Sequence, residues 1–239
     1  MPPFEYAILY HNFYDLAGIA DIRGRIAALR DRRIMLLCSL PEKFAACAPH
    51  QQDDEKFVIM RNIGKDIGGK LILIHLLLTL YSEIPYCIFL HDKRSYQKQS
   101  GQFEKDGLYK ILEPPAFRRI AEAFRTDPHL GIACAKGFLK NEYLGNGRFA
   151  TPNSQLLGVL TAKYNIHPPG FGFVAGTMFW IRTSLLRGFF RDGLAPEVRT
   201  TLETGNVLDH EHGTVTHCWE RLLSWIATSA GFKIKEFSC

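Results

Sequence analysis

Three polar clusters in this chain each lie beside an apolar segment and carry side chains that can bind or transform a ligand. The first, Arg61–Lys70, follows the apolar run Phe57–Met60 and precedes the apolar run Leu71–Leu80. This order predicts a strand, a glycine-rich turn and a helix. Ligands of open α/β sheets bind where strands end and helices begin. The first cluster therefore predicts a site for a phosphorylated small molecule.

The side chains of this first cluster suit such a ligand. Glycines such as Gly64 let a backbone approach a ligand closely, and the N–H groups at a helix start favour anions. Asn62 and Asp66 add hydrogen-bonding groups for hydroxyls. The pattern is neither GxGxxG nor the Walker sequence. A tight turn with a solvated Lys65 and Asp66 is an equally good interpretation.

The second cluster, His91–Ser95, directly follows the apolar run Pro85–Leu90. A carboxylate at the end of a central strand, here Asp92, can hold a divalent cation or a sugar hydroxyl. Lys93 and Arg94 can neutralise phosphate. Only Asp92 is acidic, so a DxD metal motif is absent, and dependence on Mg²⁺ or Mn²⁺ stays open. A surface loop with scattered charges is the alternative.

The third cluster spans Asp209–Arg221 and enters the last predicted helix, 213–230. One face of that helix carries an apolar stripe that predicts core packing. The other face is polar and is expected to border solvent or a cleft. It supplies candidate general bases. The stripe is Val215, Trp219, Leu222 and Ile226; the polar face is His217, Glu220, Arg221 and Ser224; the candidate bases are Asp209, Glu211, His217 and Glu220.

Two other interpretations of this third cluster remain. One is a metal site of a hydrolase, built from His210, His212, His217 and Cys218. Its spacings match no standard zinc pattern, and on a helix Cys218 points about 100° away from His217. The other is a network of salt bridges on the helix surface without a catalytic role.

The elements that must position these clusters alternate between strand and helix over the first ninety residues. Such alternation is typical of a mostly parallel, doubly wound sheet. No internal repeat or linker interrupts the chain, so residues 1–239 are predicted to form one α/β domain. The predicted strands are 6–10, 33–38, 57–60, 85–90, 130–135, 173–181 (one strand or two) and 232–237. The predicted helices are 19–29, 72–81, 113–125, 155–164 and 183–190, and 137–152 is predicted to be a loop.

Composition argues against a nucleic-acid-binding or membrane-spanning protein. The 239 residues are 46% apolar and carry a formal net charge of +5, without the long Lys/Arg run that is typical of nucleic-acid binders. The six cysteines form no CxxC pair, which indicates reduced thiols and a cytoplasmic protein. The run Leu71–Leu80 is too short to span a bilayer. We therefore expect at most peripheral contact with the inner face of the cytoplasmic membrane.

Taken together, the clusters resemble the rhamnan synthesis protein F family of bacterial polysaccharide glycosyltransferases. The resemblance covers about residues 6–234, and its most specific piece is Ala175–Arg182. One departure is His212, at the position before Gly213-Thr214 where the family often has an acidic residue; Asp209 or Glu211 would then act instead. The other matching pieces are Arg61–Gly68, His91–Ser95 and Gly213-Thr214 followed by His217 and Glu220-Arg221-Leu222.

The resemblance implies a GT-A-like, Rossmann-like fold and transfer of a sugar to a rhamnan, O-antigen or capsule glycan. The donor would be dTDP-rhamnose or a UDP-sugar, and the acceptor a lipid-linked glycan. We expect an inverting substitution in which a base takes the proton of the acceptor hydroxyl and cations neutralise the leaving diphosphate. Nucleotide contacts are expected from Tyr10, His11 and Ser39, donor contacts from Asn62, Gly64, Asp66, His91 and Asp92, diphosphate contacts from Lys93 or Arg94, and acceptor contacts from Ala175, Gly176 and Thr177. A non-catalytic subunit that binds nucleotide-sugar or carbohydrate in an envelope polysaccharide assembly is the alternative from another class.

Overall fold

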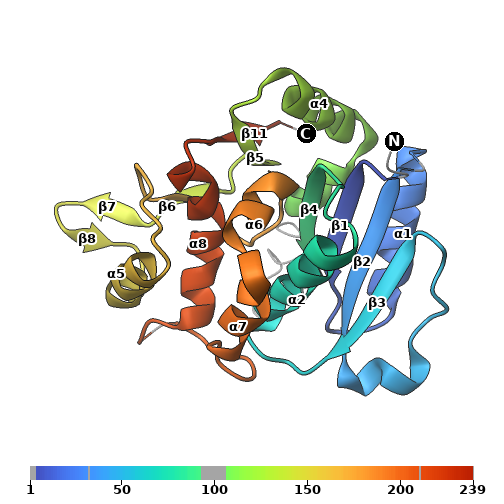
Figure 1. Ribbon diagram of the computed structural model, residues 1–239, viewed down its shortest axis with the longest axis horizontal. Helices are drawn as coiled ribbons and strands as arrows, with labels where there is room; N and C mark the ends of the chain where they lie inside the picture. Colours follow the sequence, from blue (N-terminus) through green and yellow to red (C-terminus); the bar gives the residue numbers. More distant parts are fainter. Residues whose placement is uncertain (1–3, 32, 93–105, 210, 239) are drawn as a thin grey trace.

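The computed structural model describes residues 4–31, 33–92, 106–209 and 211–238 (Figure 1). Strands and helices alternate through the first half of the chain, as the apolar runs predicted. The elements are β1 (Tyr6–His11), α1 (Ala17–Leu29), β2 (Ile34–Pro41), the 3₁₀ helix η1 (Glu42–Cys47), β3 (Glu55–Met60), α2 (Lys65–Leu80) and β4 (Tyr86–His91).

The second half adds shorter strands and the longest helix of that half, α8. Its elements are η2 (Lys110–Leu112), α4 (Pro114–Thr126), β5 (Leu130–Ala135), β6 (Leu139–Asn141), β7 (Tyr143–Gly145), β8 (Arg148–Phe149), α5 (Ser154–Lys163), β9 (Gly172–Val174), β10 (Phe179–Arg182), α6 (Thr183–Phe189), η3 (Arg191–Gly193), α7 (Leu194–Thr200), α8 (Val215–Ser229) and β11 (Lys233–Phe237).

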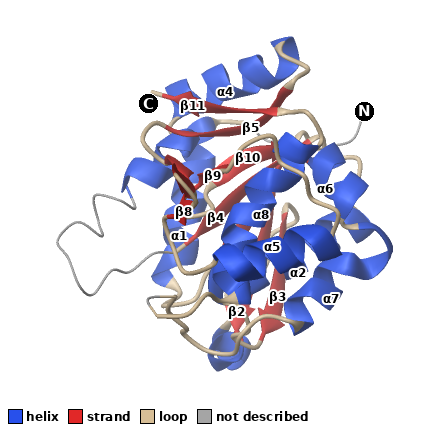
Figure 2. Cartoon of the chain, turned by 90° about the vertical axis from the view of Figure 1, so that its left-hand side faces the viewer, coloured by secondary structure: helices blue, strands red, loops and turns tan. Residues whose placement is uncertain are grey.

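A seven-stranded sheet in the order β11-β5-β10-β4-β1-β2-β3 forms the centre of the protein. All its neighbouring strands pair in parallel except β10, which is antiparallel to both β4 and β5. Helices cover both faces (Figure 2), and this explains why β1, β2, β4 and β5 are continuous apolar runs rather than alternating ones. The chain is therefore an α/β, Rossmann-like domain, which confirms the predicted fold class.

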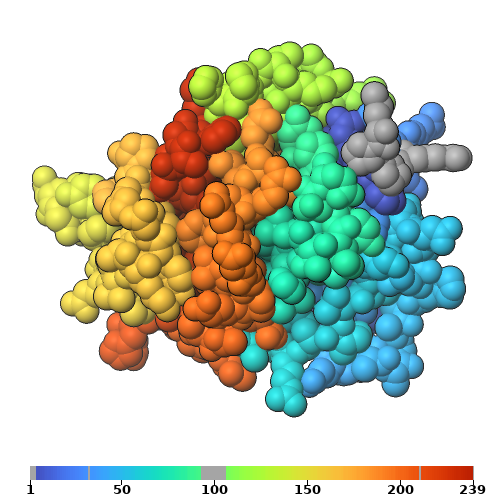
Figure 3. All heavy atoms as spheres, in the orientation of Figure 1, coloured from blue at the N-terminus to red at the C-terminus, as the bar shows by residue number. Residues whose placement is uncertain are grey.

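Alternate side chains of the strands point to opposite faces and build two separate cores. One core packs under α2, α5, α6, α7 and α8, whose side chains cover that face in the space-filling view (Figure 3). The other packs under α1, α4 and η2, where the rings of Tyr6, Phe117 and Phe124 surround Trp180. The two cores fix the sheet, and the sheet in turn fixes the positions of the strand ends.

The structure corrects several predicted boundaries. Helix α2 begins at Lys65 rather than near residue 72, so the second half of the predicted turn is helical. The segment 137–152, predicted to be a loop, contains β6, β7 and β8. The segment 173–181 is two strands in two different sheets, β9 paired with β6 and β10 in the central sheet. β6, β7 and β8 were missed because each has only two or three residues, too few to show a period, whereas β9 and β10 decide between the one strand and the two that were predicted for 173–181.

The five cysteines in the described ranges are free thiols, and four of them are buried. Across those same ranges, we find no helix with the length and apolar character needed to cross a bilayer.

Candidate functional site

A cavity of about 170 Å³ lies at the carboxyl edge of the sheet. It brings together pieces of all three polar clusters and of the Ala175–Thr177 segment. Its lining comes from the start of α2, the end of β4, the turn between β9 and β10, and the first turns of α8: Lys65, Asp66, Ile67, His91, Gly176, Thr177, Thr216, His217 and Glu220.

The sheet topology explains this location. The chain moves from β1 to β2 on one side and from β3 back to β4 on the other, so the strand order reverses between β1 and β4. Ligands of doubly wound folds bind at such a switch point, beyond the carboxyl ends of the strands. His91 is the last residue of β4 and is in register with His11 at the end of β1. Two larger hollows, of about 510 and 300 Å³, lie near the starts of β2 and β1 and contain none of the predicted site residues.

Asp66 is the central acidic side chain of the first cluster. Its Oδ2 accepts hydrogen bonds from Lys70 Nζ at 2.6 Å and from Thr177 Oγ1 at 3.2 Å. Burial alone would raise the pKa of Asp66, but the Lys70 ammonium beside it holds that pKa well below its usual range. Asp66 therefore lines the cavity as a carboxylate.

His91 lies against the same ion pair. Its Nδ1 is 3.0 Å from Lys70 Nζ and 3.5 Å from Asp66 Oδ2. Lys70 itself is fully buried, and burial lowers its pKa despite the neighbouring carboxylate. Three side chains from two elements are thus joined at one wall of the cavity.

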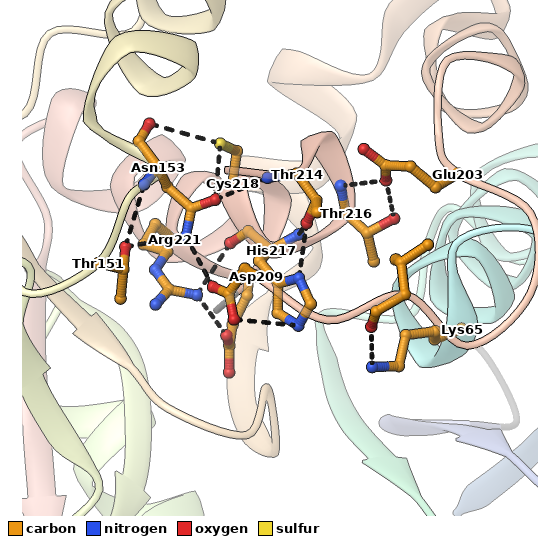
Figure 4. Close-up of polar contacts among 12 residues, drawn as sticks. Lys65, Thr151, Asn153, Glu203, Asp209, Thr214, Thr216, His217, Cys218 and Arg221 are labelled. Atoms are coloured by element: carbon orange, nitrogen blue, oxygen red, sulfur yellow. Dashed lines mark hydrogen bonds and ion pairs between the residues drawn. The ribbon is translucent and has the colours of Figure 1, made fainter. Parts of the chain in front are cut away.

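Another part of the lining comes from the start of α8, whose polar contacts are drawn in Figure 4. Thr214 is the N-cap of this helix, and its Oγ1 lies 2.6 Å from His217 Nδ1 while it accepts the His217 backbone N–H at 3.2 Å. His217 Nε2 is 3.9 Å from Asp209 Oδ1, and Asp209 Oδ2 accepts a hydrogen bond from Asn153 Nδ2 at 2.8 Å. This places a histidine beside a carboxylate that is held by a third residue.

The protonation states of this pair follow from its surroundings. Burial lowers the pKa of His217, although Asp209 acts in the opposite direction. Burial would raise the pKa of Asp209, but the Asn153 hydrogen bond and His217 bring it below its usual value. At neutral pH the imidazole is therefore neutral and able to accept a proton, next to an anion that stabilises the charged product.

Glu220 lies one turn further along α8 and also reaches the cavity. Its Oε1 accepts the Gly176 N–H at 2.7 Å, and its Oε2 accepts a hydrogen bond from Arg221 Nη1 at 2.6 Å. Glu220 therefore holds the turn between β9 and β10 against α8. In that turn, Thr177 has a φ of +47°, which a β-branched residue rarely adopts. Backbone strain of this kind is often found at ligand-binding sites.

The polar face predicted for α8 is only partly correct. His217 and Glu220 do line the cavity, but Arg221 and Ser224 are buried. Arg221 Nε donates to Glu142 Oε2 at 2.9 Å, and Ser224 Oγ accepts the Val174 N–H at 3.0 Å. These polar side chains are buried because β9 and Glu142, which follows β6, pack against that part of the helix. The sequence carried no signal for this contact.

The glycines of the first cluster serve packing rather than an open loop. Gly64 has a φ of +70°, in the left-handed region. A Cβ on Gly68 would lie 1.7 Å from the Ile63 carbonyl oxygen, and one on Gly69 would lie 2.3 Å from His11 Nδ1. Neither Gly64 nor Asn62 is among the residues that line the cavity.

The residues predicted to contact the nucleotide are buried away from the cavity. Tyr10, His11 and Ser39 are at most 3% exposed. His11 Nδ1 and Ser39 Oγ lie 2.8 Å apart, and burial lowers the pKa of His11 to about 4. Direct contact of these three with a nucleotide does not fit their burial. Helix α2 packs against His11 and Ser39 at Gly69, whereas Tyr10 lies on the other face of the sheet, where Gly18 of α1 packs against it.

Asp92 is almost buried, and its two carboxylate oxygens accept the backbone N–H groups of Phe13 and Tyr14 at 2.9 and 2.6 Å. It ties the loop after β1 to the end of β4. Among the residues with a described placement, no three His, Cys, Asp or Glu side chains gather as metal ligands. In the described residues Asp92 therefore links two loops, and a site for Mg²⁺ or Mn²⁺ there stays a prediction.

The remaining predicted residues divide into two groups. Lys93, Arg94 and His210 lie outside the described residues. Glu211 and His212 are exposed and do not line the cavity, whereas Cys218 is buried with its Sγ 3.9 Å from the Asn153 carbonyl oxygen. The proposed hydrolase ligands His212 and Cys218 therefore face different surroundings.

Several functional candidates were missed by the sequence analysis. Lys70 and Thr214 contact cavity residues directly, and Asn153 orients Asp209. Glu203 accepts the backbone N–H groups of Val215 and Thr216 at 2.6 and 2.9 Å at the start of α8. Lys70 had a detectable signal, since it is a cation four residues after Asp66 at the start of an apolar helix.

Comparison with known proteins identifies two relatives. Both are proteins of Xanthomonas campestris pv. campestris, from strains B100 and ATCC 33913, that bear the name uncharacterized protein WxcX. Each is 29% identical to this chain over 180 residues, which covers 72% of the chain but 24% of the relative. The chain thus spans about a quarter of the length of the curated relatives it matches. No family model matches the chain, so the resemblance to rhamnan synthesis protein F stays a prediction.

Proposed function

We propose that the protein is a glycosyltransferase that moves a sugar from a nucleotide-sugar donor to a growing cell-surface polysaccharide or lipopolysaccharide glycan. The observation that supports it best is the convergence of Asp66, His91 and His217 on one cavity at the switch point of the sheet. These residues come from three clusters far apart in the sequence. The resemblance noted in the sequence adds a GT-A-like fold, dTDP-rhamnose or a UDP-sugar as donor, and a lipid-linked acceptor to the proposal.

In this proposal His217 is the base. Its neutral imidazole takes the proton of the acceptor hydroxyl while that oxygen attacks the anomeric carbon, and the bond to the nucleoside diphosphate breaks. Asp209, 3.9 Å from Nε2, stabilises the imidazolium that forms. Glu220 is a less suitable base because both its oxygens already accept hydrogen bonds from Gly176 and Arg221.

Other parts of the proposal extend beyond the cavity. A donor diphosphate needs cations or N–H donors, and Lys93 and Arg94 come directly after Asp92 in the sequence, close to the end of β4. A requirement for Mg²⁺ or Mn²⁺ and a location at the inner face of the cytoplasmic membrane remain predictions. The proton transfer and the substitution described for His217 do not depend on a metal ion.

The proposal is tested with the purified full chain and a panel of UDP-, dTDP- and GDP-sugars. Donor binding should raise the melting temperature, and release of the nucleoside diphosphate should require an acceptor extract. His217→Ala should keep donor binding and lose turnover, whereas His75→Ala, which changes an exposed histidine of α2, should keep both. If the protein binds a donor but does not turn it over with any acceptor extract, the result would instead favour a non-catalytic binding subunit.

A further inference from the structure

Lys70 is a fully buried cation directly behind the cavity wall. It is surrounded along α2 by Ile67, Leu71 and Ile74, each at most 2% exposed. A buried ammonium is costly unless it is paired and hydrogen-bonded. Its two contacts, Asp66 Oδ2 at 2.6 Å and His91 Nδ1 at 3.0 Å, are both to residues that line the cavity. Lys70 itself is not part of the lining.

These two contacts fix the chemistry of Asp66 and His91. An ammonium has three donors and no acceptor, so His91 Nδ1 must accept its hydrogen bond. In the neutral ring the proton then resides on Nε2. On Asp66, Oδ2 receives both Lys70 and Thr177, which fixes the carboxylate plane. The wall therefore carries an oriented acceptor and an imidazole with a defined tautomer.

The size and charge of the cavity indicate which part of a donor it can hold. Its volume of about 170 Å³ is below the roughly 300–1,000 Å³ typical of sites for whole drug-sized ligands. Two of its lining residues are the acids Asp66 and Glu220, while the Lys65 ammonium is bonded to the Val207 carbonyl at 2.9 Å. Carboxylates accept hydrogen bonds from hydroxyls but repel phosphates. A single neutral ring with several hydroxyls fits this lining better than a diphosphate.

We propose that the cavity is the subsite for the transferred sugar ring and that Lys70 is its positioning residue. Lys70 does not touch the ligand itself; it holds Asp66 and His91 in the orientation in which they can bind adjacent hydroxyls of the sugar. This inference rests on the proposed sugar transfer, and it assigns the sugar rather than the diphosphate to the cavity.

The positioning role is tested by ¹⁵N NMR of the His91 imidazole in the full chain. In the wild type, Nδ1 should be unprotonated and Nε2 protonated. Lys70→Met should move the proton to Nδ1, because that atom then has Asp66 Oδ2 at 3.5 Å as its acceptor. Lys65→Met removes the same charge from the first residue of α2, whose ammonium is bonded to the Val207 carbonyl, and should leave the tautomer unchanged.

A second variant covers the case in which Lys70→Met fails to fold. Asp66→Asn retains Lys70 as the donor to Nδ1, so the wild-type tautomer should persist. A wild-type ring protonated on Nδ1, a folded Lys70→Met variant with an unchanged tautomer, or a tautomer change in Asp66→Asn would each overturn the positioning role.

The sugar subsite is tested by comparing each nucleotide-sugar with its own nucleoside diphosphate: UDP-glucose with UDP, and dTDP-rhamnose with dTDP. Asp66→Asn should weaken binding of the nucleotide-sugar by roughly tenfold to a hundredfold, the effect of losing a hydrogen bond to a charged group. Binding of the diphosphate alone should stay within about twofold, well under the tenfold that 1.4 kcal/mol represents. Equal losses for both ligands would overturn the sugar subsite. If the wild type binds no nucleotide at all, the glycosyltransferase proposal and the subsite fail together, while the NMR result still decides the role of Lys70.

Discussion

Arg221 Nε donates a hydrogen bond to Glu142 Oε2 at 2.9 Å, and the side chains of both residues are almost completely buried. This ion pair joins α8 to the segment between β6 and β7. Arg221 also donates to Glu220, which lines the cavity. The shape of the candidate site therefore depends on a contact between residues 79 positions apart.

We expect Glu142→Ala to destabilise the protein strongly, because it leaves the Arg221 guanidinium buried without its carboxylate. Loss of one partner of a buried pair costs about 3–5 kcal/mol, and the remaining bond to Glu220 should bring the loss toward the lower figure. The loss in the free energy of unfolding is measured by denaturant-induced unfolding. Glu122→Ala is the control, because its partner Arg125 is exposed on α4 and such pairs contribute at most about 1 kcal/mol. Equal effects of the two substitutions would contradict the prediction.

Gly69→Ala should destabilise the protein by about 1–3 kcal/mol, the usual range for overpacking. The new methyl group would lie 2.3 Å from His11 Nδ1 and 2.9 Å from Ser39 Oγ. The same change at Gly24 in α1 meets no atom within 4 Å, so there the better helix propensity of alanine should add up to about 1 kcal/mol. In a thermal melt, Gly69→Ala should lower the melting temperature and Gly24→Ala should raise it. A neutral Gly69→Ala would show that α2 does not pack this closely on β1 and β2.

Burial of His11 makes stability depend on pH. Its pKa falls from 6.5 to about 4 on folding, so between these values the unfolded state binds more protons. This contribution is complete above about pH 6.5 and is lost as the pH falls toward 4; it amounts to about 3 kcal/mol at 1.36 kcal/mol per pKa unit. His11→Asn should make the pH dependence of the unfolding free energy shallower by that amount. The lowered pKa of His217 also makes the wild type less stable at low pH. The pH dependence of the unfolding free energy of His11→Asn is therefore compared with that of the wild type, and equal pH dependence in the two proteins would refute the prediction.

If the protein turns over a nucleotide-sugar, His217→Ala should lower kcat by about 10² to 10⁴, the range for loss of a general base. Asp209→Asn should lower the pKa of His217 further, since it removes the negative charge that opposes the effect of burial. The acid limb of the pH profile of kcat/KM should then move to lower pH. A limb that stays in place in Asp209→Asn would show that another group is the base.

Much of the fold could be predicted from local pattern alone. The continuous apolar runs at β1, β4 and β5 indicated buried parallel strands, because only strands covered on both faces lack alternation. The polar residues that follow such runs then had to lie at the carboxyl edge of the sheet. Asp66 and His91 were selected as site candidates for this reason, and His217 for its place on the polar face of the last predicted helix. The structure places all three at the cavity.

Other features depend on contacts that no local pattern records. The glycine-rich turn became the start of α2, and its Gly69 fits closely against His11 and Ser39, which are 58 and 30 residues earlier in the chain. Burial of Ser39 follows from that same packing, whereas Tyr10 is buried on the opposite face of the sheet, against α1.

The sequence by itself determined the succession of strands and helices and which ends of the strands carry polar groups, since hydrophobic period and turn composition are local properties. The tertiary structure decided the strand order, including the antiparallel β10, and which polar side chains are buried as pairs and which face the cavity. Those outcomes depend on the free energy of bringing distant segments together, as Lys70 with His91 and Arg221 with Glu142 demonstrate.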